Sequence, residues 1–201
     1  MAGHWRGIGR AWVGGWRRIS SLVAVCMALV TAGPARAHQI DTSYLTVIAR
    51  PDTLKLVLVI DESILLRGFQ FDRNNDGTLW REEMLSGVPE VFEYAASHMT
   101  LQADGQALPL ERVSGNVQPD NDGNMYISVL WRAAMRQPAV DLGIGTSFAD
   151  RLGPDHRVLV KILRQDQPMV QAVLNADTAL QLFRIGEPSA GVLDQIERWF
   201  R

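Results

Sequence analysis

The chain has 201 residues, of which 20 are Lys or Arg and 22 are Asp or Glu, and its single cysteine is Cys26. Residues 1–37 contain five of the arginines and no acidic residue, so residues 38–201 hold 15 basic and 22 acidic residues, a net charge of −7. Such a surface has no electrostatic attraction for nucleic acid or anionic lipid. Without cysteine, residues 38–201 also cannot form disulfides, thiol nucleophiles or thiolate metal sites.

The first 37 residues have the pattern of a secretory signal peptide. Arg17 and Arg18 precede an apolar stretch at residues 22–30, and a small-x-small end follows at residues 35–37. The apolar stretch is shorter than the roughly 20 residues that a bilayer span needs; an uncleaved anchor helix is the alternative. We therefore expect an exported protein, periplasmic or on the outer face of the cytoplasmic membrane, whose 164 residues after Ala37 suit one domain.

The next elements are a hairpin and a helical insertion. Residues 41–50 and 53–61 are rich in β-branched and aromatic types and flank a turn at Pro51 and Asp52. Residues 62–69 read as a short helical or irregular link, and a helical pattern covers residues 81–98. Because Pro89 lacks an amide hydrogen, we expect a break or two consecutive helices there.

The chain then returns to strand patterns. The candidates are residues 99–103, 107–114, 124–132, 138–143, 156–164 and 168–174, separated by turn signals such as Asp104-Gly105. This spacing predicts a mainly β fold over residues 38–186, a sandwich or partly open barrel, with an EF-hand-like insertion at about 62–98. Residues 187–201 carry apolar side chains at helical spacing and predict a C-terminal amphipathic helix, docked on the domain or leading into a membrane.

Residues 72–83 match the template of an EF-hand calcium loop. Six positions would hold the ion: Asp72, Asn74, Asp76, Thr78 through its carbonyl, Trp80 through a water, and Glu83 through both carboxylate oxygens. Gly77 stands where the loop turns sharply, and Leu79 is expected to point into the core and to start a short strand. The spacing predicts one structural Ca²⁺.

Three features depart from the template. Trp80 replaces the small polar residue usual at its position, no clear amphipathic helix precedes Asp72, and no second loop accompanies the first. A decayed loop that keeps its shape by hydrogen bonds is therefore the alternative to a functional site. Asp120-Asn121-Asp122-Gly123 resembles a loop fragment, but it lacks the terminal carboxylates and predicts a hairpin turn.

Cleavage after Ala37 would make His38 the first residue. Its amine and imidazole together suit Cu²⁺ or Ni²⁺. Only His98 and His156 could supply a third imidazole, and neither has a recognisable metal spacing. This possible second metal site defines an alternative function, a soluble periplasmic copper- or nickel-binding protein.

No catalytic residues are predicted. The chain lacks a Gly-x-Ser-x-Gly elbow, a phosphate loop and a His-Glu-x-x-His motif, so a non-enzymatic protein without an identified small-molecule substrate is expected. An enzyme whose site is assembled from scattered residues is the third hypothesis.

Two segments resemble the start of the mature HupE/UreJ-type membrane proteins. These are Ala37-His38-Gln39 and Ser43-Tyr44-Leu45-Thr46-Val47, followed by the acidic loop and by an aromatic helix pattern at 196–200. The resemblance covers about residues 38–201. It implies an extracytoplasmic domain of a membrane protein associated with nickel or cobalt handling, either stand-alone or separated from its membrane domain. That membrane domain, or another membrane protein, would be its partner.

Overall fold

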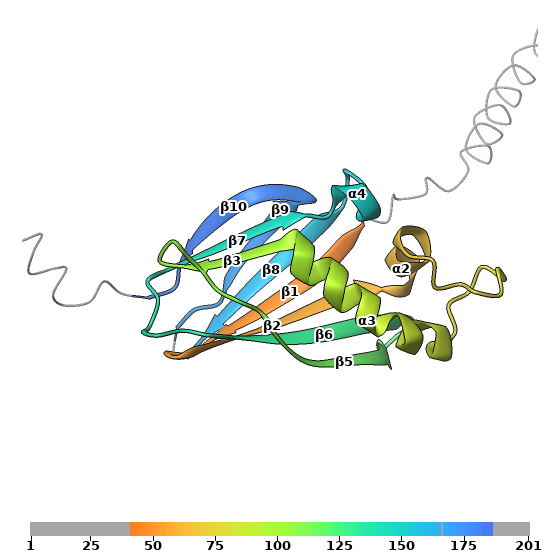
Figure 1. Ribbon diagram of the computed structural model, residues 1–201, viewed down its shortest axis with the longest axis horizontal. Coiled ribbons are helices and arrows are strands. Elements are labelled where there is room, and N and C mark those ends of the chain that lie inside the picture. The colour runs from red at the N-terminus through yellow and green to blue at the C-terminus, as the bar shows by residue number, and fades with distance from the viewer. Residues whose placement is uncertain (1–40, 166, 187–201) are drawn as a thin grey trace, which may run out of the picture. The chain divides into compact units, whose positions relative to one another are not determined.

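Two β-sheets are present in the part of the chain that the computed structural model describes, residues 41–165 and 167–186. The larger sheet has the strand order β5-β6-β2-β1-β8-β9, and the smaller has the order β10-β7-β3-β4 (Figure 1). The strands are β1 (Thr42–Ala49), β2 (Thr53–Asp61), β3 (Met99–Ala103), β4 (Gln106–Ala107), β5 (Glu111–Pro119), β6 (Met125–Ala134), β7 (Asp141–Ser147), β8 (Arg157–Arg164), β9 (Val170–Asn175) and β10 (Asp177–Arg184). The mainly β class and the sandwich-like arrangement are therefore confirmed, and neither sheet closes on itself.

The hairpin expected at the start is present. Strands β1 and β2 pair antiparallel, with Tyr44 opposite Val59, and the amide of Arg50 donates to the carbonyl of Thr53 at 2.9 Å to close the turn. Alternate residues of both strands, such as Leu45 and Leu56, are fully buried. The period of two places these side chains on one face, so that face becomes the core.

Strand β1 also pairs with β8, and this is the one parallel pairing among the described strands. Thr42 lies opposite Arg157, so the centre of the larger sheet joins residues more than a hundred positions apart. Parallel neighbours need a long connection, and here that connection contains the whole helical insertion and both strands of the β5–β6 hairpin.

The insertion forms helices α2 (Glu62–Gly68) and α3 (Arg81–His98). The break expected at Pro89 was wrong, because α3 is one helix with Pro89 inside it. Pro89 cannot donate to the carbonyl of Leu85. Both residues are exposed, so that carbonyl lies on the water-facing side, while Val91 and Phe92 pack into the core and hold the helix together.

Helix α3 packs over the part of the larger sheet that the smaller sheet leaves uncovered. It contacts β5, β6 and β3, and the ring of Phe92 meets Trp131 edge to face with centroids 5.2 Å apart. The approach is close at Gly115 of β5, where an added Cβ would lie 2.3 Å from a methyl group of Val88. The absence of a side chain at Gly115 therefore lets α3 lie against the strand.

Several boundaries differ from expectation. The segment expected at 107–114 is split into β4 and β5, the strand expected at 138–143 begins at Asp141, and helix α4 (Ala149–Leu152) and strand β10 were missed. Strand β10 contains a register shift between Thr178 and Gln181, which interrupts the alternation that would have revealed it. The signal peptide and the helix expected at 187–201 lie outside the described residues.

Candidate metal centre

The loop of residues 72–83 lies between two helices. Helix α2 ends at Gly68, Phe69 and Phe71 are buried, and α3 begins at Arg81. Figure 1 shows the loop projecting from the end of the molecule where α2 and the start of α3 lie. The short link expected at 62–69 is therefore helical and has seven residues, and the segment has the helix–loop–helix order of the template.

The first half of the loop folds around the carboxylate of Asp72. Its two oxygens accept the amide of Asp76 at 3.2 Å and the amide of Gly77 at 2.9 Å. Gly77 has φ of +80° and Asn75 has φ of +57°, values that favour glycine and asparagine. The local sequence therefore supplies the sharp turn that the template places at Gly77.

Asp76 is the most extensively hydrogen-bonded residue of the loop. Its carboxylate accepts the amide of Thr78 at 2.8 Å, the side-chain amide of Asn74 at 2.9 Å and the indole Nε1–H of Trp80 at 2.9 Å. The bond from Trp80, then that from Thr78, holds the pKa of the Asp76 carboxyl below its usual range. A carboxylate that stays ionised is what a hard cation requires.

Glu83 joins the two ends of the loop. It lies in the first turn of α3, and its carboxylate accepts the amide of Arg73 at 3.0 Å and that of Trp80 at 3.0 Å. One oxygen therefore reaches the residue next to Asp72, and the other caps the helix. This is the placement expected of the bidentate ligand that closes an EF-hand loop over its ion.

The expectation for Leu79 is met in part. Leu79 points into the core as expected and is 2% exposed, but it forms no strand. A short strand in this position would need a second loop to pair with, and Leu79 instead donates its amide to the carboxylate of Glu62 at 3.4 Å. Sequence spacing gave no indication of this contact with Glu62, because the two residues are 17 positions apart in different elements.

Trp80 is the largest departure. Its side chain is 57% exposed and offers a donor to Asp76 rather than an oxygen to an ion. Any ligand at this position must be a water beside the indole ring. The expected coordinating set is thus five protein residues, Asp72, Asn74, Asp76, Thr78 and Glu83, with Trp80 holding one of them in place.

The carboxylates of the loop are not gathered at one point. Within residues 41–165 and 167–186, no three side chains of His, Cys, Asp and Glu are close enough together to hold a metal ion. The carboxylates of Asp72, Asp76 and Glu83 accept backbone amides instead, which offsets the repulsion among them. The donor set is all oxygen and the backbone turns at Gly77 as the template requires, so the residue types of the loop suit Ca²⁺.

The histidines of the described residues do not form a second site. His38 lies outside those residues, so its metal role stays a prediction. His156 is completely buried, with Nε2 3.0 Å from the hydroxyl of Ser43. His98 stacks on Tyr94, and its Nδ1 lies 2.8 Å from the carbonyl of Tyr94. Nε2 of His156 and Nδ1 of His98 are therefore engaged in structural contacts.

The acidic segment at 120–123 is a hairpin turn, as predicted. The amide of Asp120 donates to the carbonyl of Asn124 at 2.8 Å, Gly123 has φ of +88°, and β5 and β6 pair on either side. The Asp120 carboxylate accepts the amides of Asp122 and Asn124. Its oxygens therefore close the turn.

Comparison with known proteins finds no protein-family model and no curated protein that matches the chain. Among the described residues, no helix combines the length and apolar composition of a membrane span.

Proposed function

We propose that residues 72–83 bind one Ca²⁺ and that the chain is a non-enzymatic, extracytoplasmic calcium-binding domain. The observation that carries the proposal is the position of Glu83, whose carboxylate returns from α3 to the amides of Arg73 and Trp80. This placement brings the carboxylate at the last position of the loop back to the residue that follows Asp72, the carboxylate at its first position.

The role of the ion would be structural. Helix α3 packs on both sheets, and Leu79 anchors the loop in the core, so an ion held between Asp72 and Glu83 would fasten the start of α3 to the end of α2. Unpaired extracellular sites bind Ca²⁺ at about 10⁻⁴ to 10⁻³ M. At about 10 mM calcium, such a site would stabilise the fold by roughly 1.4 to 2.7 kcal/mol.

Thermal unfolding in calcium and in chelator tests this site. The chain should melt at higher temperature in 10 mM calcium (about ten to a hundred times the expected Kd), and Glu83→Gln should lose that increase. In chelator the two proteins should differ little, because Gln keeps one oxygen for one of the two amides. The matched control is Glu82→Gln, which removes the neighbouring carboxylate of the same helical turn and should keep the calcium response. Equal responses of the chain and Glu83→Gln would refute the site.

Terbium luminescence provides a direct readout. Tb³⁺ replaces Ca²⁺ in oxygen sites and is excited by a nearby indole, and Trp80 lies within the loop, bonded to Asp76. Tb³⁺ should therefore become luminescent on excitation of tryptophan, and excess calcium should quench the signal. Trp80→Phe should lose most of the luminescence because it removes the indole that excites the ion, and it should keep part of the rise in melting temperature with calcium because Asp76 retains its bonds from Thr78 and Asn74. Luminescence that survives both Trp80→Phe and Glu83→Gln would place the metal elsewhere.

The wider role is an accessory or interaction domain of a membrane metal-transport protein of the nickel or cobalt type. It is supported by the resemblance of Ala37-His38-Gln39 and residues 43–47 to the HupE/UreJ-type proteins, and by the signal-peptide pattern that would export the domain. The gene downstream of the Arg201 codon tests this role. Apolar segments of about 20 residues in the same reading frame are expected, and a stop codon there would favour a stand-alone domain.

A further inference from the structure

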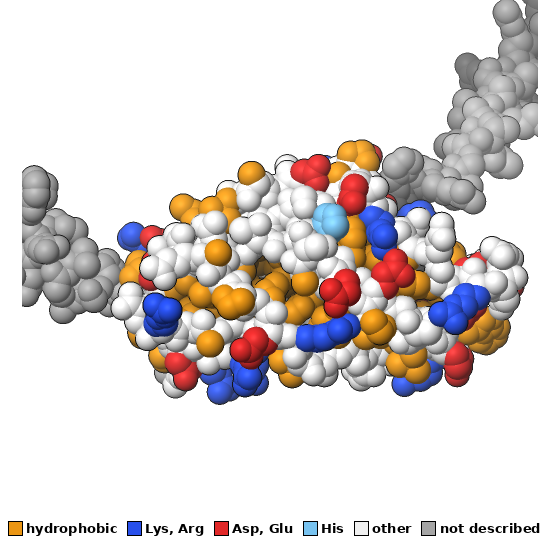
Figure 2. Space-filling view, in the orientation of Figure 1, with side chains coloured by type: hydrophobic (Ala, Val, Ile, Leu, Met, Phe, Trp, Pro, Cys, Tyr) orange, Lys and Arg blue, Asp and Glu red, His pale blue; other side chains and the backbone are white. Residues whose placement is uncertain are grey.

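A cleft opens between the β3–β4 hairpin and the end of β6, away from the calcium loop. It has a volume of about 590 Å³, within the range of roughly 300 to 1,000 Å³ that is typical of binding pockets. Its apolar lining includes Ala103, Leu108 and Met135. Figure 2 shows hydrophobic side chains in the hollow on this face of the molecule. The larger sheet has six strands and the smaller has four, and α3 packs on β5, β6 and β3.

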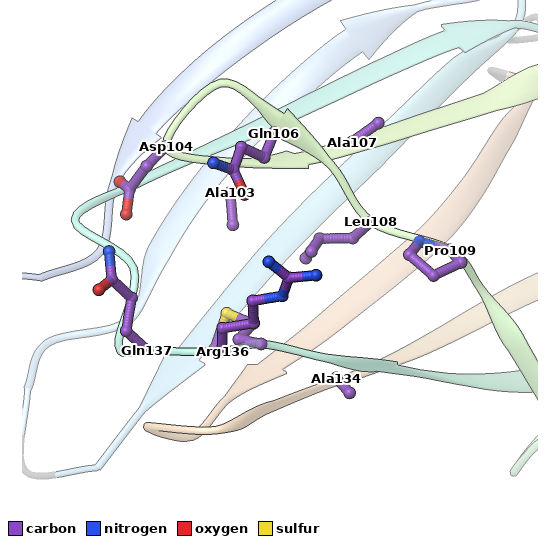
Figure 3. Close-up of a pocket in the computed structure, with 10 residues that line it drawn as sticks. Ala103, Asp104, Gln106, Ala107, Leu108, Pro109, Ala134, Arg136 and Gln137 are labelled. Atoms are coloured by element: carbon purple, nitrogen blue, oxygen red, sulfur yellow. The ribbon is translucent and has the colours of Figure 1, made fainter.

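One cation points into this cleft. Figure 3 shows Arg136, which lies just past the end of β6, directed toward the β3–β4 hairpin, between Leu108 and Gln106. Within residues 41–165 and 167–186 its guanidinium forms no ion pair. The acid at the rim, Asp104, is already engaged, because its carboxylate accepts the amides of Val140 and Asp141 at 3.0 and 2.8 Å. The cleft therefore suits an occupant with an apolar body and a carboxylate.

The last described residues, Ile185 and Gly186, lie beside the cleft. The amides of Ile185 and Gly186 both donate to the carbonyl of Val140, at 2.7 and 3.1 Å. Gly186 lines a second hollow of about 180 Å³, and Met135 lines both this hollow and the cleft. The side chain of Met135 therefore separates Gly186, after which 15 residues follow, from the cleft. Residues 190–201, if helical, would be about 18 Å long. Their apolar residues at helical spacing are Val192, Leu193, Ile196, Trp199 and Phe200, with Asp194 and Glu197 between them.

We propose that residues 187–201 dock in this cleft, with their apolar face against Leu108 and Met135 and an acidic side chain of the segment paired with Arg136. The hydrophobic effect supplies the affinity, and the short tether supplies a high effective concentration. The cleft would then be an internal docking site, closed by the chain itself.

Cross-linking of cysteine pairs in the full chain tests the docking. The only natural cysteine is Cys26, which is replaced by Ala. One variant carries Ala103→Cys in the cleft together with Ile196→Cys. The control carries Leu182→Cys with Ile196→Cys; Leu182 is 65% exposed and packs beside Gly143 on the outside of the smaller sheet. Position 182 is much closer to 196 in sequence, so a free tether favours the control pair, whereas docking favours the cleft pair.

A short bismaleimide should join positions 103 and 196 at least about tenfold faster than positions 182 and 196. Arg136→Glu should slow the cleft reaction by up to about fivefold, the range of an exposed ion pair, and Arg136→Lys should keep most of the rate. Equal or faster reaction of the control pair overturns the docking, and so does a product that is mainly a cross-linked dimer, which would identify a second copy as the occupant. An unchanged rate in Arg136→Glu overturns the ion pair.

Discussion

The buried pair of Ser43 and His156 leads to a specific prediction about acid stability. His156 is completely buried, its Nε2 lies 3.0 Å from the hydroxyl of Ser43, and its Nδ1 has no hydrogen-bond partner. Burial, and then the charges of Arg157 and Arg67, lower the pKa of His156 from 6.5 to about 4. The folded protein therefore holds a neutral imidazole where the unfolded chain would take up a proton.

The sign and size of the effect follow from proton linkage. The pKa of the His156 imidazole is lower in the folded protein than in the unfolded chain. The contribution of His156 to the free energy of unfolding is therefore fully present above pH 6.5 and is lost as the pH falls from 6.5 to 4. A shift of this size makes the free energy of unfolding about 2.5 kcal/mol smaller at pH 4.5 than at pH 7.5. That loss is a large fraction of the roughly 5 to 15 kcal/mol that stabilises a typical domain.

Urea unfolding at the two pH values measures this loss. In His156→Gln the side-chain amide can still bond Ser43 but cannot titrate, so that variant should lose about 2.5 kcal/mol less stability than the parent on acidification. All carboxylates are shared by the two proteins, so their titration cancels in the comparison. Equal losses would show that His156 is not responsible and would refute the reasoning.

Three substitutions test the packing around α3 and the core by urea unfolding at neutral pH. Gly87→Ala would place a Cβ 2.5 Å from the ring of Phe71, and overpacking should cost about 1 to 3 kcal/mol; no loss would mean that Phe71 moves freely. Tyr94→Phe removes the hydroxyl that bonds Asp150 at 2.9 Å and should cost about 1 kcal/mol, whereas a gain in stability would contradict that bond. Trp131→Ala empties a fully buried site and should cost about 3 to 5 kcal/mol; a smaller loss would indicate collapse of the cavity.

Features that depend on neighbouring residues were predictable from the sequence. The alternation of residues 53–61 gave strand β2 with the correct ends, and the Asp-Gly signal at 122–123 gave the turn between β5 and β6. The turn of the loop at 72–83 belongs to the same class, because the position of Gly77 and the inward position of Leu79 are set by spacing within twelve residues. Each of these features forms from local backbone preferences.

Long-range contacts were decided only by the tertiary structure. The parallel pairing of β1 with β8 and the contact of Ser43 with His156 join residues more than a hundred positions apart. The continuity of α3 through Pro89 depends on the core that Val91 and Phe92 enter, and the cleft at Arg136 exists because two sheets of unequal width are stacked. Periodicity shows which face of a strand is apolar, but the partner of that face is chosen by packing of the whole chain.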